Sequence, residues 1–472
     1  MTQRRQAATR RSSETRPQPP HAREGGGGAG TAQLAGMSSA HLACLLVQRL
    51  AVLSFHTSPL AQPGAGDGGG MNVYVRELSS ALARSGAECD VFTRASAPDL
   101  PTTVLVEPGF RVHHVPAGPP APVPKWRLLD LVGEFTDGVL AMMGADGAAG
   151  LGRGGGDGHP FGAVHANYWL SGIAGHRIKH ELDLPLVSTF HTLERVKAEA
   201  SPLDGSVCEP GKRAEAEAEV IRCSDALLAS CSVEADQLVD LYAADPARIT
   251  VVAPGVDHAF FGPGHRPQAR RALGLPEQVP ILVFVGRIQP LKGADVALRA
   301  LAELRRHPDA LLVVVGGPSG PMGEPHLDYL HLLAKELDVA DRVRFVEPQP
   351  HELLSSYYRA ADVCIVPSRS ESFGLVALEA AACGTPVVAA AVGGLTTLVD
   401  DGRTGYLVDS TSQRAPAAFA DAVARVLDDP LLAGQMGADA VSRARRYTWA
   451  RAASVLCATY GRLDAQRLVE CR

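Results

Sequence analysis

Two glutamates eight residues apart, Glu371 and Glu379, are the residues whose type and spacing most strongly suggest chemistry. Glu371 precedes a run of helical composition from Leu375 to Ala382, and Glu379 lies inside that run. The first N–H groups of a helix have no partner within it, so the helix start attracts anions. Both carboxylates can therefore reach one extended polar ligand in a cleft. The structural alternative is that Glu379 is an ordinary exposed helical residue and Glu371 a partner of the helix dipole.

Two cations occupy the loop after another predicted strand. The sequence VGRIQPLKG places Arg287 and Lys292 directly behind the strand that begins at Ile281. A guanidinium and an ammonium group in one loop can converge on a diphosphate, because both donate charge-assisted hydrogen bonds to phosphate oxygens. The alternative is a pair of solvated loop charges.

A histidine follows a strand in the preceding half of the chain. His191, Thr192 and Lys197 come after this predicted strand, so they would face the cationic loop across a cleft. A lone histidine in this position can also be a packing or capping residue. Neither H-E-x-x-H nor G-x-S-x-G occurs in the sequence, so a zinc protease site and a hydrolase triad are both unsupported.

The segment HTSPLAQPGAGDGGGM joins the first predicted strand to a helix that starts at Asn72, and it has the composition of a ligand-binding loop. It contains the dinucleotide pattern G-x-G-x-x-G at Gly64, Gly66 and Gly69, which leaves a nicotinamide-dependent dehydrogenase open as a rival function. That pattern requires a glycine at the strand end and an acidic residue after the next strand, where this chain has Arg94. We therefore expect the glycines at 68–70 to let main-chain N–H groups approach a sugar or a phosphate.

Strands and helices alternate along both halves, which predicts an α/β fold with two doubly wound parallel sheets of the Rossmann type. The expected strands are Leu50–Phe55, Cys89–Thr93, Phe110–Val115, Ala163–His165, Leu186–Thr189, Ala226–Ser230, Ile281–Gly286, Leu311–Gly316, Val343–Val346, Val363–Val366 and Val387–Ala391. We expect an extension at 1–49, domains at 50–262 and 263–447, and a helix at 448–472 that crosses back to the first domain. Ligands bind at the carboxyl ends of parallel strands, so the site should lie where the domains face each other.

The composition describes a globular chain of 472 residues with 46% hydrophobic residues and a net charge of −6, which argues against a nucleic-acid binder. No apolar stretch reaches the roughly 18 to 20 residues that a membrane span requires. The nine cysteines form no C-x-x-C motif, and Cys44, Cys364 and Cys383 lie in apolar contexts typical of reduced, buried thiols. These features predict a cytoplasmic protein.

Residues 1–36 contain six arginines, two glutamates and a run of four glycines without apolar periodicity, so we expect them to be disordered. Met37 is an alternative start of the chain.

A series of segments resembles one enzyme family. In chain order they are HTSPLAQPGAGDGGGMNVYV, HANYWLSG, STFHTLERVK, VAPGVD, FVGRIQPLKG, GGPSGP and ESFGLVALEAAACGTPVVAAAVGGL, and they are similar to the retaining GT-B glycosyltransferases of family 4. The segments HTSPLAQPG and GGMNVYV point to the subgroup that acts on inositol phosphate. The resemblance implies the GT-B fold and retaining transfer of N-acetylglucosamine from UDP-N-acetylglucosamine to 1D-myo-inositol 3-phosphate, the first step of mycothiol biosynthesis, with release of UDP.

The resemblance also implies roles for individual residues. The implied donor-binding residues are Gln62, Pro63, Gly70, Arg287, Lys292, Gln349, Glu371 and Glu379. The implied acceptor-binding residues are His56, Asp67, Gly68, Gly69, Gly70, Met71, Asn72, Lys125, Tyr168, Thr192 and Arg213. The implied catalytic residues are His191, which lies near the anomeric carbon in such enzymes, together with Arg287, Lys292 and Glu371. Some relatives hold a structural magnesium ion through main-chain oxygens, here at Tyr358, Arg359, Ala361 and Thr385, and a homodimer is implied as well.

The sequence departs from the family pattern at three places. HANYWLSG replaces HSHYWLSG, Gln349 stands where many relatives have arginine beside the uracil, and Glu194 follows His-Thr-Leu where a small residue is usual. Two alternatives remain open. One is a family 4 glucosyl- or N-acetylglucosaminyltransferase that acts on another cyclitol or a sugar phosphate, and the other is a binding protein without catalytic activity.

Overall fold

The computed structural model describes residues 49–64, 66, 68–148, 160–200, 211–320, 322–463 and 466–471. All of them belong to one compact unit. The tail at 1–36, Met37, Cys44 and the implied acceptor residue Asp67 lie outside the described residues.

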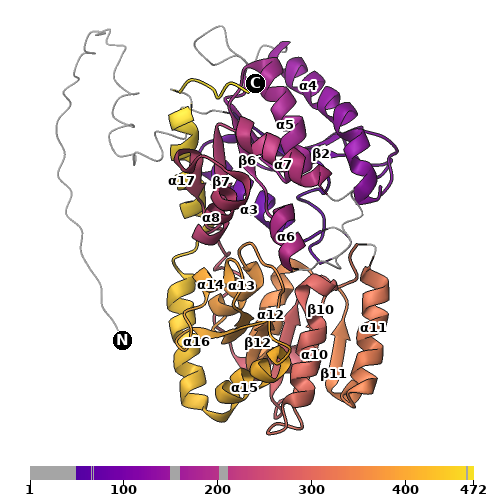
Figure 1. The fold of residues 1–472 in the computed structure, drawn as a ribbon, viewed down its shortest axis with the longest axis vertical. Helices are drawn as coiled ribbons and strands as arrows, with labels where there is room; N and C mark the ends of the chain where they lie inside the picture. Colours follow the sequence, from indigo (N-terminus) through magenta and orange to yellow (C-terminus); the bar gives the residue numbers. More distant parts are fainter. Residues whose placement is uncertain are drawn as a thin grey trace, which may run out of the picture. The chain divides into compact units, whose positions relative to one another are not determined.

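An eight-stranded sheet forms the first half of the described chain (Figure 1). Its strand order is β3-β4-β2-β1-β5-β6-β7-β8, and only β3 runs antiparallel to its neighbour. The strands are β1 (Arg49–Leu53), β2 (Glu88–Arg94), β3 (Thr103–Glu107), β4 (Phe110–Val115), β5 (Ala163–Asn167), β6 (Leu186–Thr189), β7 (Ala226–Ala229) and β8 (Ile249–Val251). The strand order reverses between β1 and β5, so their carboxyl ends mark the expected ligand crevice.

A six-stranded parallel sheet forms the second half, with the order β11-β10-β9-β12-β13-β14. The strands are β9 (Ile281–Val285), β10 (Leu311–Val315), β11 (Val343–Val346), β12 (Val363–Val366), β13 (Val387–Ala390) and β14 (Gly405–Val408). Here the order reverses between β9 and β12. The loops after these two strands contain the cations and the first glutamate that the sequence singled out.

Helices accompany each sheet (Figure 1). Those of the first half are α3 (Gly70–Arg84), α4 (Val132–Ala148), α5 (Trp169–Leu182), α6 (Glu194–Ala200), α7 (Lys212–Cys223) and α8 (Ser232–Tyr242), with 3-10 turns η1 (Lys125–Leu131) and η2 (Pro246–Arg248). The later helices are α9 (Arg266–Ala272), α10 (Ala294–Glu303), α11 (Gly323–Glu336), α12 (Leu354–Ala360), α13 (Leu375–Ala382), α14 (Leu395–Leu398), α15 (Ala415–Asp428), α16 (Pro430–Ala444) and α17 (Trp449–Leu463), with 3-10 turns η3 (Pro290–Lys292), η4 (Ala340–Arg342) and η5 (His351–Leu353).

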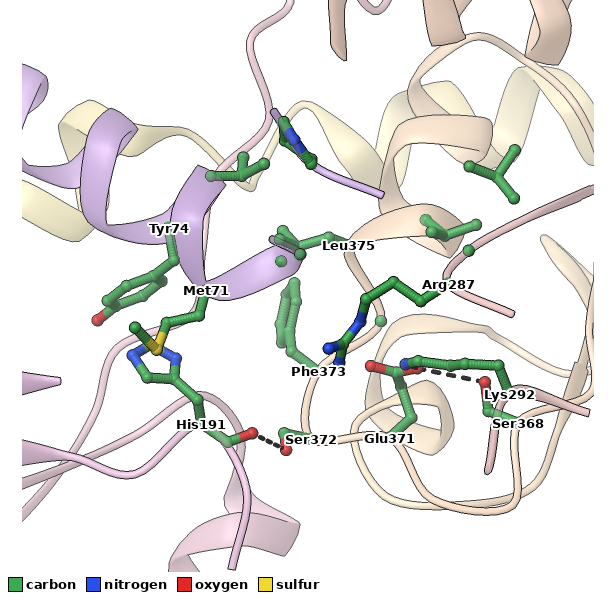
Figure 2. A pocket seen from close by; sticks show the side chains of 18 of the residues that line it. Met71, Tyr74, His191, Arg287, Lys292, Ser368, Glu371, Ser372, Phe373 and Leu375 are labelled. Carbon is green, nitrogen blue, oxygen red and sulfur yellow. Dashed lines mark hydrogen bonds and ion pairs between the residues drawn. The ribbon is translucent and has the colours of Figure 1, made fainter. Parts of the chain in front are cut away.

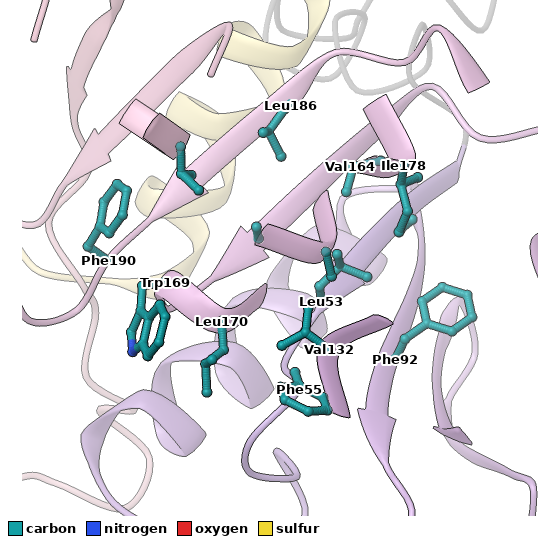
Figure 3. Packing of buried hydrophobic residues seen from close by; sticks show 14 of the residues in the cluster. Leu53, Phe55, Phe92, Val132, Val164, Trp169, Leu170, Ile178, Leu186 and Phe190 are labelled. Atoms are coloured by element: carbon teal, nitrogen blue, oxygen red, sulfur yellow. The ribbon is translucent and has the colours of Figure 1, made fainter. Parts of the chain in front are cut away.

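The core of the first half consists of apolar side chains from strands and helices packed on one face of the sheet (Figure 3). Leu53 of β1, Val164 of β5 and Leu186 of β6 lie against residues of α5 such as Ile178. Strands covered on both faces are apolar at nearly every position, and this made them recognisable in the sequence.

The last helix, α17, packs against the first half although it follows the second half in the chain. Its residues Trp449, Ala453 and Leu456 share a buried cluster with Leu50 and Val52 of β1. A polar contact fixes the same arrangement, because the Tyr460 hydroxyl lies 2.8 Å from Nδ1 of the buried His165 on β5. The predicted domain limits at 262–263 and 447–448 stay a prediction.

The predicted alternation of strands and helices is confirmed, and the predicted strand limits agree with the structure to within two residues. The prediction missed β3, β8 and β14. β3 is an antiparallel edge strand whose Leu105 is 67% exposed, so it lacks the continuous apolar run that marked the other strands. β8 contains only three residues, too few for a clear pattern, and β14 begins with a glycine, which shortens its apolar run.

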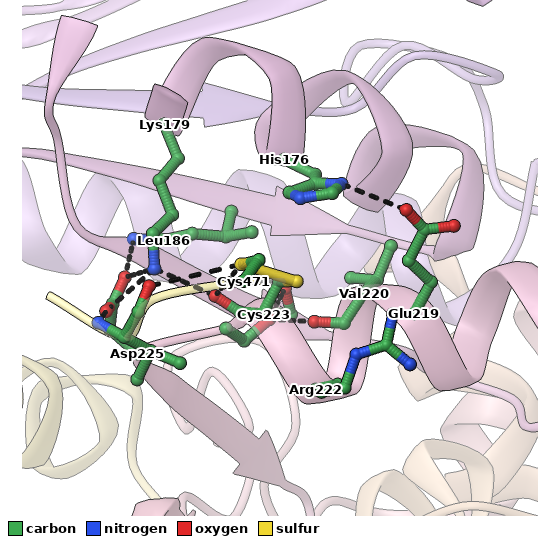
Figure 4. Close-up of a disulfide and its surroundings, with 12 residues drawn as sticks. His176, Lys179, Leu186, Glu219, Val220, Arg222, Cys223, Asp225 and Cys471 are labelled. Carbon is green, nitrogen blue, oxygen red and sulfur yellow. Dashed lines mark hydrogen bonds and ion pairs between the residues drawn. A yellow bond between two sulfur atoms is a disulfide. The ribbon is translucent and has the colours of Figure 1, made fainter. Parts of the chain in front are cut away.

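The cysteines divide into two groups. Cys364 and Cys383 are buried free thiols, as the sequence predicts, and burial raises the pKa of both. In contrast, Cys223 at the end of α7 and Cys471 near the end of the chain form a disulfide, close to the buried ion pair of Lys179 and Asp225 (Figure 4). No helix among the described residues is both long and apolar enough to cross a membrane.

Candidate active site

One cavity of about 260 Å³ is lined by loops from both halves of the chain (Figure 2). The first half contributes the glycine loop with the start of α3 and the loops after β6 and β7. The second half contributes the loops after β9, β10 and β12 and the start of α13. These loops follow the carboxyl ends of the strands, where ligands bind in parallel sheets, so the position of the cavity agrees with the prediction.

The cationic loop and the first glutamate meet inside this cavity. Lys292 Nζ donates a hydrogen bond to Glu371 Oε2 over 2.7 Å, and Ser368 Oγ lies 3.3 Å from the same oxygen. Arg287 also lines the cavity, and its Nη1 lies 3.5 Å from Ser319 Oγ. Lys292 and Glu371 therefore form an ion pair at the carboxyl ends of β9 and β12, and Arg287 lines the same cavity.

The backbone around Glu371 allows no side chain at a neighbouring position. Gly393 has a φ of +48°, and a Cβ there would lie 1.8 Å from the Glu371 carbonyl oxygen. The same carbonyl accepts a hydrogen bond from Gly394 N over 3.0 Å. Glycine is the residue that tolerates this combination of left-handed backbone and close approach. The GG pair after β13 thus fixes the loop that positions Glu371.

Glu379 is a buried residue of α13 with only 5% exposure. His351 Nε2 lies 2.7 Å from its Oε1, and the Tyr358 hydroxyl donates to its Oε2 over 2.8 Å. Burial lowers the pKa of His351, but the charge and hydrogen bond of Glu379, together with the charges of Glu77 and Glu352, outweigh it, so the pKa lies above its ordinary value. The alternative of an exposed helical glutamate is excluded, since Glu379 lines the cavity and is held by two partners.

His191 faces the same cavity from the first half. Its φ of +61° is unusual for a residue with a side chain, and such backbone strain is common at functional sites. Nε2 donates to Asn167 Oδ1 over 2.9 Å, and burial together with His165 lowers the pKa of His191 to about 3. The imidazole is therefore neutral at physiological pH. The His191 carbonyl accepts a hydrogen bond from Ser372 Oγ, so it contacts the loop of Glu371 directly (Figure 2).

The glycine loop is shaped by Asn72 at the start of α3. Asn72 Oδ1 accepts a hydrogen bond from Gly69 N over 2.8 Å, and its Nδ2 donates to Thr57 Oγ1 over 2.7 Å. A Cβ at Gly69 would lie 3.2 Å from Arg287 Nε, so the two halves approach closely here. The loop also reaches the second half through Gln62 Nε2, which donates to the Pro348 carbonyl over 3.1 Å.

The residues implied for the acceptor form a second cluster beside the cavity, built around the Tyr168 ring. The His56 ring lies 4.3 Å from it, Arg213 Cζ 5.0 Å and Lys125 Nζ 6.0 Å, all measured between or to ring centroids. Burial and the nearby charge of Lys125 hold the pKa of His56 well below its ordinary value. Thr192 connects the cluster to the cavity, because it lines the cavity and accepts hydrogen bonds from Arg213.

The structure thus brings most of the implied residues together. Those that line the cavity are Pro63, Gly69, Gly70, Met71, His191, Thr192, Arg287, Lys292, Gln349, Glu371 and Glu379. Gln62, Gly68 and Asn72 belong to the loop that borders the cavity, while His56, Lys125, Tyr168 and Arg213 form the neighbouring cluster. Lys197, on α6, is not among the residues that line the cavity.

Two cavity residues escaped the sequence reasoning. Glu234 at the start of α8 lines the cavity, and its Oε2 accepts a hydrogen bond from Ser230 N over 2.7 Å. Burial raises the pKa of Glu234. Ser230 follows β7 directly, and its Oγ lies 3.2 Å from the Ser372 carbonyl of the other half. The position of Ser230 at the carboxyl end of a predicted strand was the signal that could have identified both residues.

Three of the implied magnesium ligands lie at the end of α12 and the fourth, Thr385, lies between α13 and β13, all outside the cavity. Tyr358, Arg359 and Ala361 form or follow the last turn of α12, where carbonyl groups lack helical partners and the helix dipole favours a cation. The Tyr358 carbonyl is already occupied in part, since Thr385 Oγ1 donates to it over 2.6 Å. Main-chain oxygens at a helix end fit a hard cation that prefers oxygen ligands, although no carboxylate belongs to the set.

Two family descriptions together match most of the described chain. "Glycosyl transferase 4-like domain" matches residues 69–255, and "Glycosyl transferases group 1" matches residues 265–445. The D-inositol 3-phosphate glycosyltransferase 2 of Catenulispora acidiphila is 47% identical over 425 residues, which cover 88% of this chain and 95% of the relative. The D-inositol 3-phosphate glycosyltransferase of Actinosynnema mirum is 48% identical over 420 residues, with 88% and 97% covered.

Solved structures agree on the fold. The sucrose-phosphate synthase of Thermosynechococcus elongatus is 32% identical with a TM-score of 0.79, over 89% of this chain and 99% of the other. The HepE protein of Anabaena, solved with UDP and glucose, is 18% identical with a TM-score of 0.65, over 89% and 98%. The rival prediction of a nicotinamide-dependent dehydrogenase is therefore wrong. The chain is an enzyme of the GT-B fold and belongs to the glycosyltransferase family that contains the D-inositol 3-phosphate glycosyltransferases.

Proposed function

We propose that this enzyme transfers N-acetylglucosamine from UDP-N-acetylglucosamine to 1D-myo-inositol 3-phosphate with retention of the anomeric configuration and releases UDP. This is the first step of mycothiol biosynthesis. The observation that carries the proposal is the meeting of Arg287, Lys292 and Glu371 with His191 in one cavity between two Rossmann-like halves. The names of the relatives at 47–48% identity support the choice of acceptor.

The cations act on the leaving group. When the bond between the anomeric carbon and the diphosphate breaks, negative charge grows on the diphosphate oxygens and positive charge on the sugar ring. Arg287 and Lys292 are in place before the reaction, so they stabilise the leaving diphosphate without a reorganisation cost. The N-terminus of α13 adds its positive dipole end on the same side.

The carboxylates bind the sugar-bearing part of the donor. Glu371 lies beside Lys292 and is placed to accept hydrogen bonds from the transferred sugar. Glu379 lies deeper, where it would accept from the ribose hydroxyls, and His351 and Tyr358 hold its carboxylate in one orientation. Glu371 in the loop before α13 and Glu379 inside the helix thus follow the order of the sugar and the ribose in a nucleotide sugar.

Retention follows from attack on the side that the diphosphate leaves. The acceptor hydroxyl oxygen forms the new bond to the anomeric carbon, the bond to the diphosphate breaks, and a departing phosphate oxygen takes the hydroxyl proton. His191 is neutral with a pKa of about 3, so it is a weak base. Its role is to contact the donor near the anomeric carbon and not to take up a proton. The Glu234 carboxylate accepts a hydrogen bond from Ser230 N, which supports a structural role for Glu234.

The experiment combines purified protein with UDP-N-acetylglucosamine or UDP-glucose and a panel of cyclitols and sugar phosphates. UDP release and the anomeric configuration of the product are measured. We expect the highest kcat/KM with UDP-N-acetylglucosamine and inositol 3-phosphate, and an α-linked product. Equal use of free myo-inositol would contradict the inositol-phosphate assignment and leave another cyclitol as the acceptor class.

A substitution tests the placement of the acceptor. Arg213→Ala removes a buried cation of the Tyr168 cluster, and a charge-assisted hydrogen bond contributes about 1.5 to 3 kcal/mol. We therefore expect the acceptor KM to rise roughly 10- to 150-fold while the donor KM changes little. Lys125→Ala should act in the same direction. A change in the donor KM alone would mean that Arg213 and Lys125 bind the donor and not the acceptor.

Three finer expectations are part of the proposal. A magnesium ion held by main-chain oxygens of Tyr358, Arg359, Ala361 and Thr385 would be structural, so metal removal should lower the thermal midpoint rather than the turnover per folded molecule. A homodimer is expected in sedimentation at micromolar concentration. A cytoplasmic location is expected too, although the disulfide of Cys223 and Cys471 is uncommon in that compartment.

A further inference from the structure

The guanidinium of Arg213 is surrounded by partners of its own chain. Nε donates to Glu217 Oε1 over 2.8 Å, and Nη2 donates to both oxygens of Thr192 over 2.8 and 3.1 Å. An arginine side chain has five N–H bonds, so among the described residues these contacts leave the two on Nη1 for a ligand. An anion that approaches Arg213 must therefore bind at Nη1.

A second carboxylate already lies at this position. Glu194 Oε2 lies 3.1 Å from Arg213 Nη1, and the two side chains are only 14% and 6% exposed. Glu217 is fully buried, and its Oε2 accepts hydrogen bonds from the Tyr242 hydroxyl and from Glu194 N. Glu217 therefore has a structural role. Glu194 is the first residue of α6 and comes two residues after Thr192, which lines the cavity.

The net charge of Arg213, Glu194 and Glu217 disfavours the binding of a dianion. Arg213 contributes one positive charge, and Glu194 and Glu217 contribute one negative charge each, so the three side chains together are negative. A phosphate bound at Nη1 would lie against the Glu194 carboxylate, and repulsion between like charges in a partly buried site is only weakly screened. Lys125 beside Tyr168 and Lys197, whose charge also acts on Tyr168, then add to the attraction between Arg213 and the phosphate.

We propose that Glu194 determines acceptor specificity by occupying the edge of Arg213 that would bind phosphate. Its carboxylate thus weakens the preference of the enzyme for phosphorylated over unphosphorylated acceptors, compared with the same site without this charge. This inference rests on the proposed function, because it assigns the Tyr168 cluster to the acceptor. It differs from a purely structural role, in which Glu194 only caps α6 and neutralises Arg213.

The test compares wild type with Glu194→Gln and Glu194→Ala. The quantity measured is the ratio of kcat/KM for inositol 3-phosphate to that for myo-inositol. Removal of the charge should raise this ratio about tenfold or more, mainly through a lower KM for the phosphorylated acceptor. Glu215→Gln is the matched control, because it removes the same charge from an exposed position of α7 and should leave the ratio unchanged.

A binding measurement separates this inference from the proposed function. Inorganic phosphate is titrated into protein saturated with UDP, which fills the donor site, and the affinity is read by calorimetry. Glu194→Gln should bind phosphate about tenfold more tightly than wild type, and Arg213→Ala in the same variant should abolish the gain. If wild type uses neither acceptor, the proposed function is wrong. The tighter phosphate binding of Glu194→Gln would still test whether Glu194 occupies the phosphate-binding edge of Arg213. An unchanged phosphate affinity and an unchanged acceptor ratio in folded Glu194 variants would overturn the inference.

Discussion

The contact between Lys292 and Glu371 predicts a specific non-additivity in catalysis. Lys292→Met keeps most of the side-chain volume but removes the ammonium group, which lies 2.7 Å from Glu371 Oε2. Loss of one preorganised donor to a developing oxyanion costs about 10² to 10³ in kcat, or roughly 3 to 4 kcal/mol. The variant suffers a second loss, because Glu371 is 18% exposed and would face the diphosphate without its counter-charge. We therefore expect kcat to fall at least a hundredfold.

Glu371→Gln removes that uncompensated charge. In the double variant the penalty from the unpaired carboxylate disappears. The increase in activation free energy of the double variant should therefore be smaller than the sum of the two single-variant increases by about 1 kcal/mol or more. Single-turnover measurements of UDP formation at saturating substrates separate the chemical step from product release. Lys335→Met, at an exposed position of α11, is the control for charge and should behave as wild type.

Two results would refute this reasoning. A Lys292→Met enzyme that turns over like wild type would mean that the diphosphate binds elsewhere. Additive effects within about 0.5 kcal/mol would mean that the ion pair has no part in catalysis, even if both residues contact the donor.

Three further predictions concern the glycine loop, the nucleotide end of the cavity and the tail. Gly69→Ala should lower kcat at least tenfold in the UDP-release assay, because its Cβ would lie 3.2 Å from Arg287 Nε and displace this cation, and unchanged kcat would contradict the contact. His351→Gln should lower the free energy of unfolding in urea more at pH 6 than at pH 9. The pKa of His351 is raised by Glu379, so its stabilising effect is complete below the ordinary pKa of about 6.5 and is lost as the pH rises through the higher folded-state value. Deletion of residues 1–36 should leave kcat unchanged, since their composition cannot bury a core, and a tenfold loss with the fold intact would reveal a role for the tail.

The loops of the proposed donor side were visible in the sequence because their signals are local. Arg287, Lys292 and Glu371 each lie in a loop directly after an apolar strand, and parallel sheets place such loops at one edge. The strands themselves are visible as apolar runs, and the helix of Glu379 begins after a glycine. The burial of Glu379 by His351 and Tyr358 could not be predicted, since those partners come from a segment more than twenty residues earlier.

The proposed acceptor side depends on contacts between distant segments. Tyr168, Lys125 and Arg213 come from three separate loops or helix ends, and only the family resemblance suggested that they meet. Their positions agree with that suggestion, but the surroundings of Arg213 do not follow from it. The sequence shows Glu194 as an unusual residue after His-Thr-Leu, whereas the ion pair with Arg213 depends on how α6 and α7 pack. Packing of this kind has no local signal, so a chain-specific change in charge balance is visible only in the structure.

Hydrogen bonds join the two halves at the loop that contains Glu371. Ser372 follows Glu371 directly and donates to the His191 carbonyl, while its own carbonyl lies 3.2 Å from Ser230 Oγ. These contacts involve few side chains and several main-chain groups, so they can break and re-form at modest cost compared with an apolar interface. A donor bound by Glu371 and an acceptor bound near His191 would both favour the state in which this loop touches the first half. The two Ser372 contacts therefore hold the loop of Glu371 against the first half, beside the cavity that both halves line.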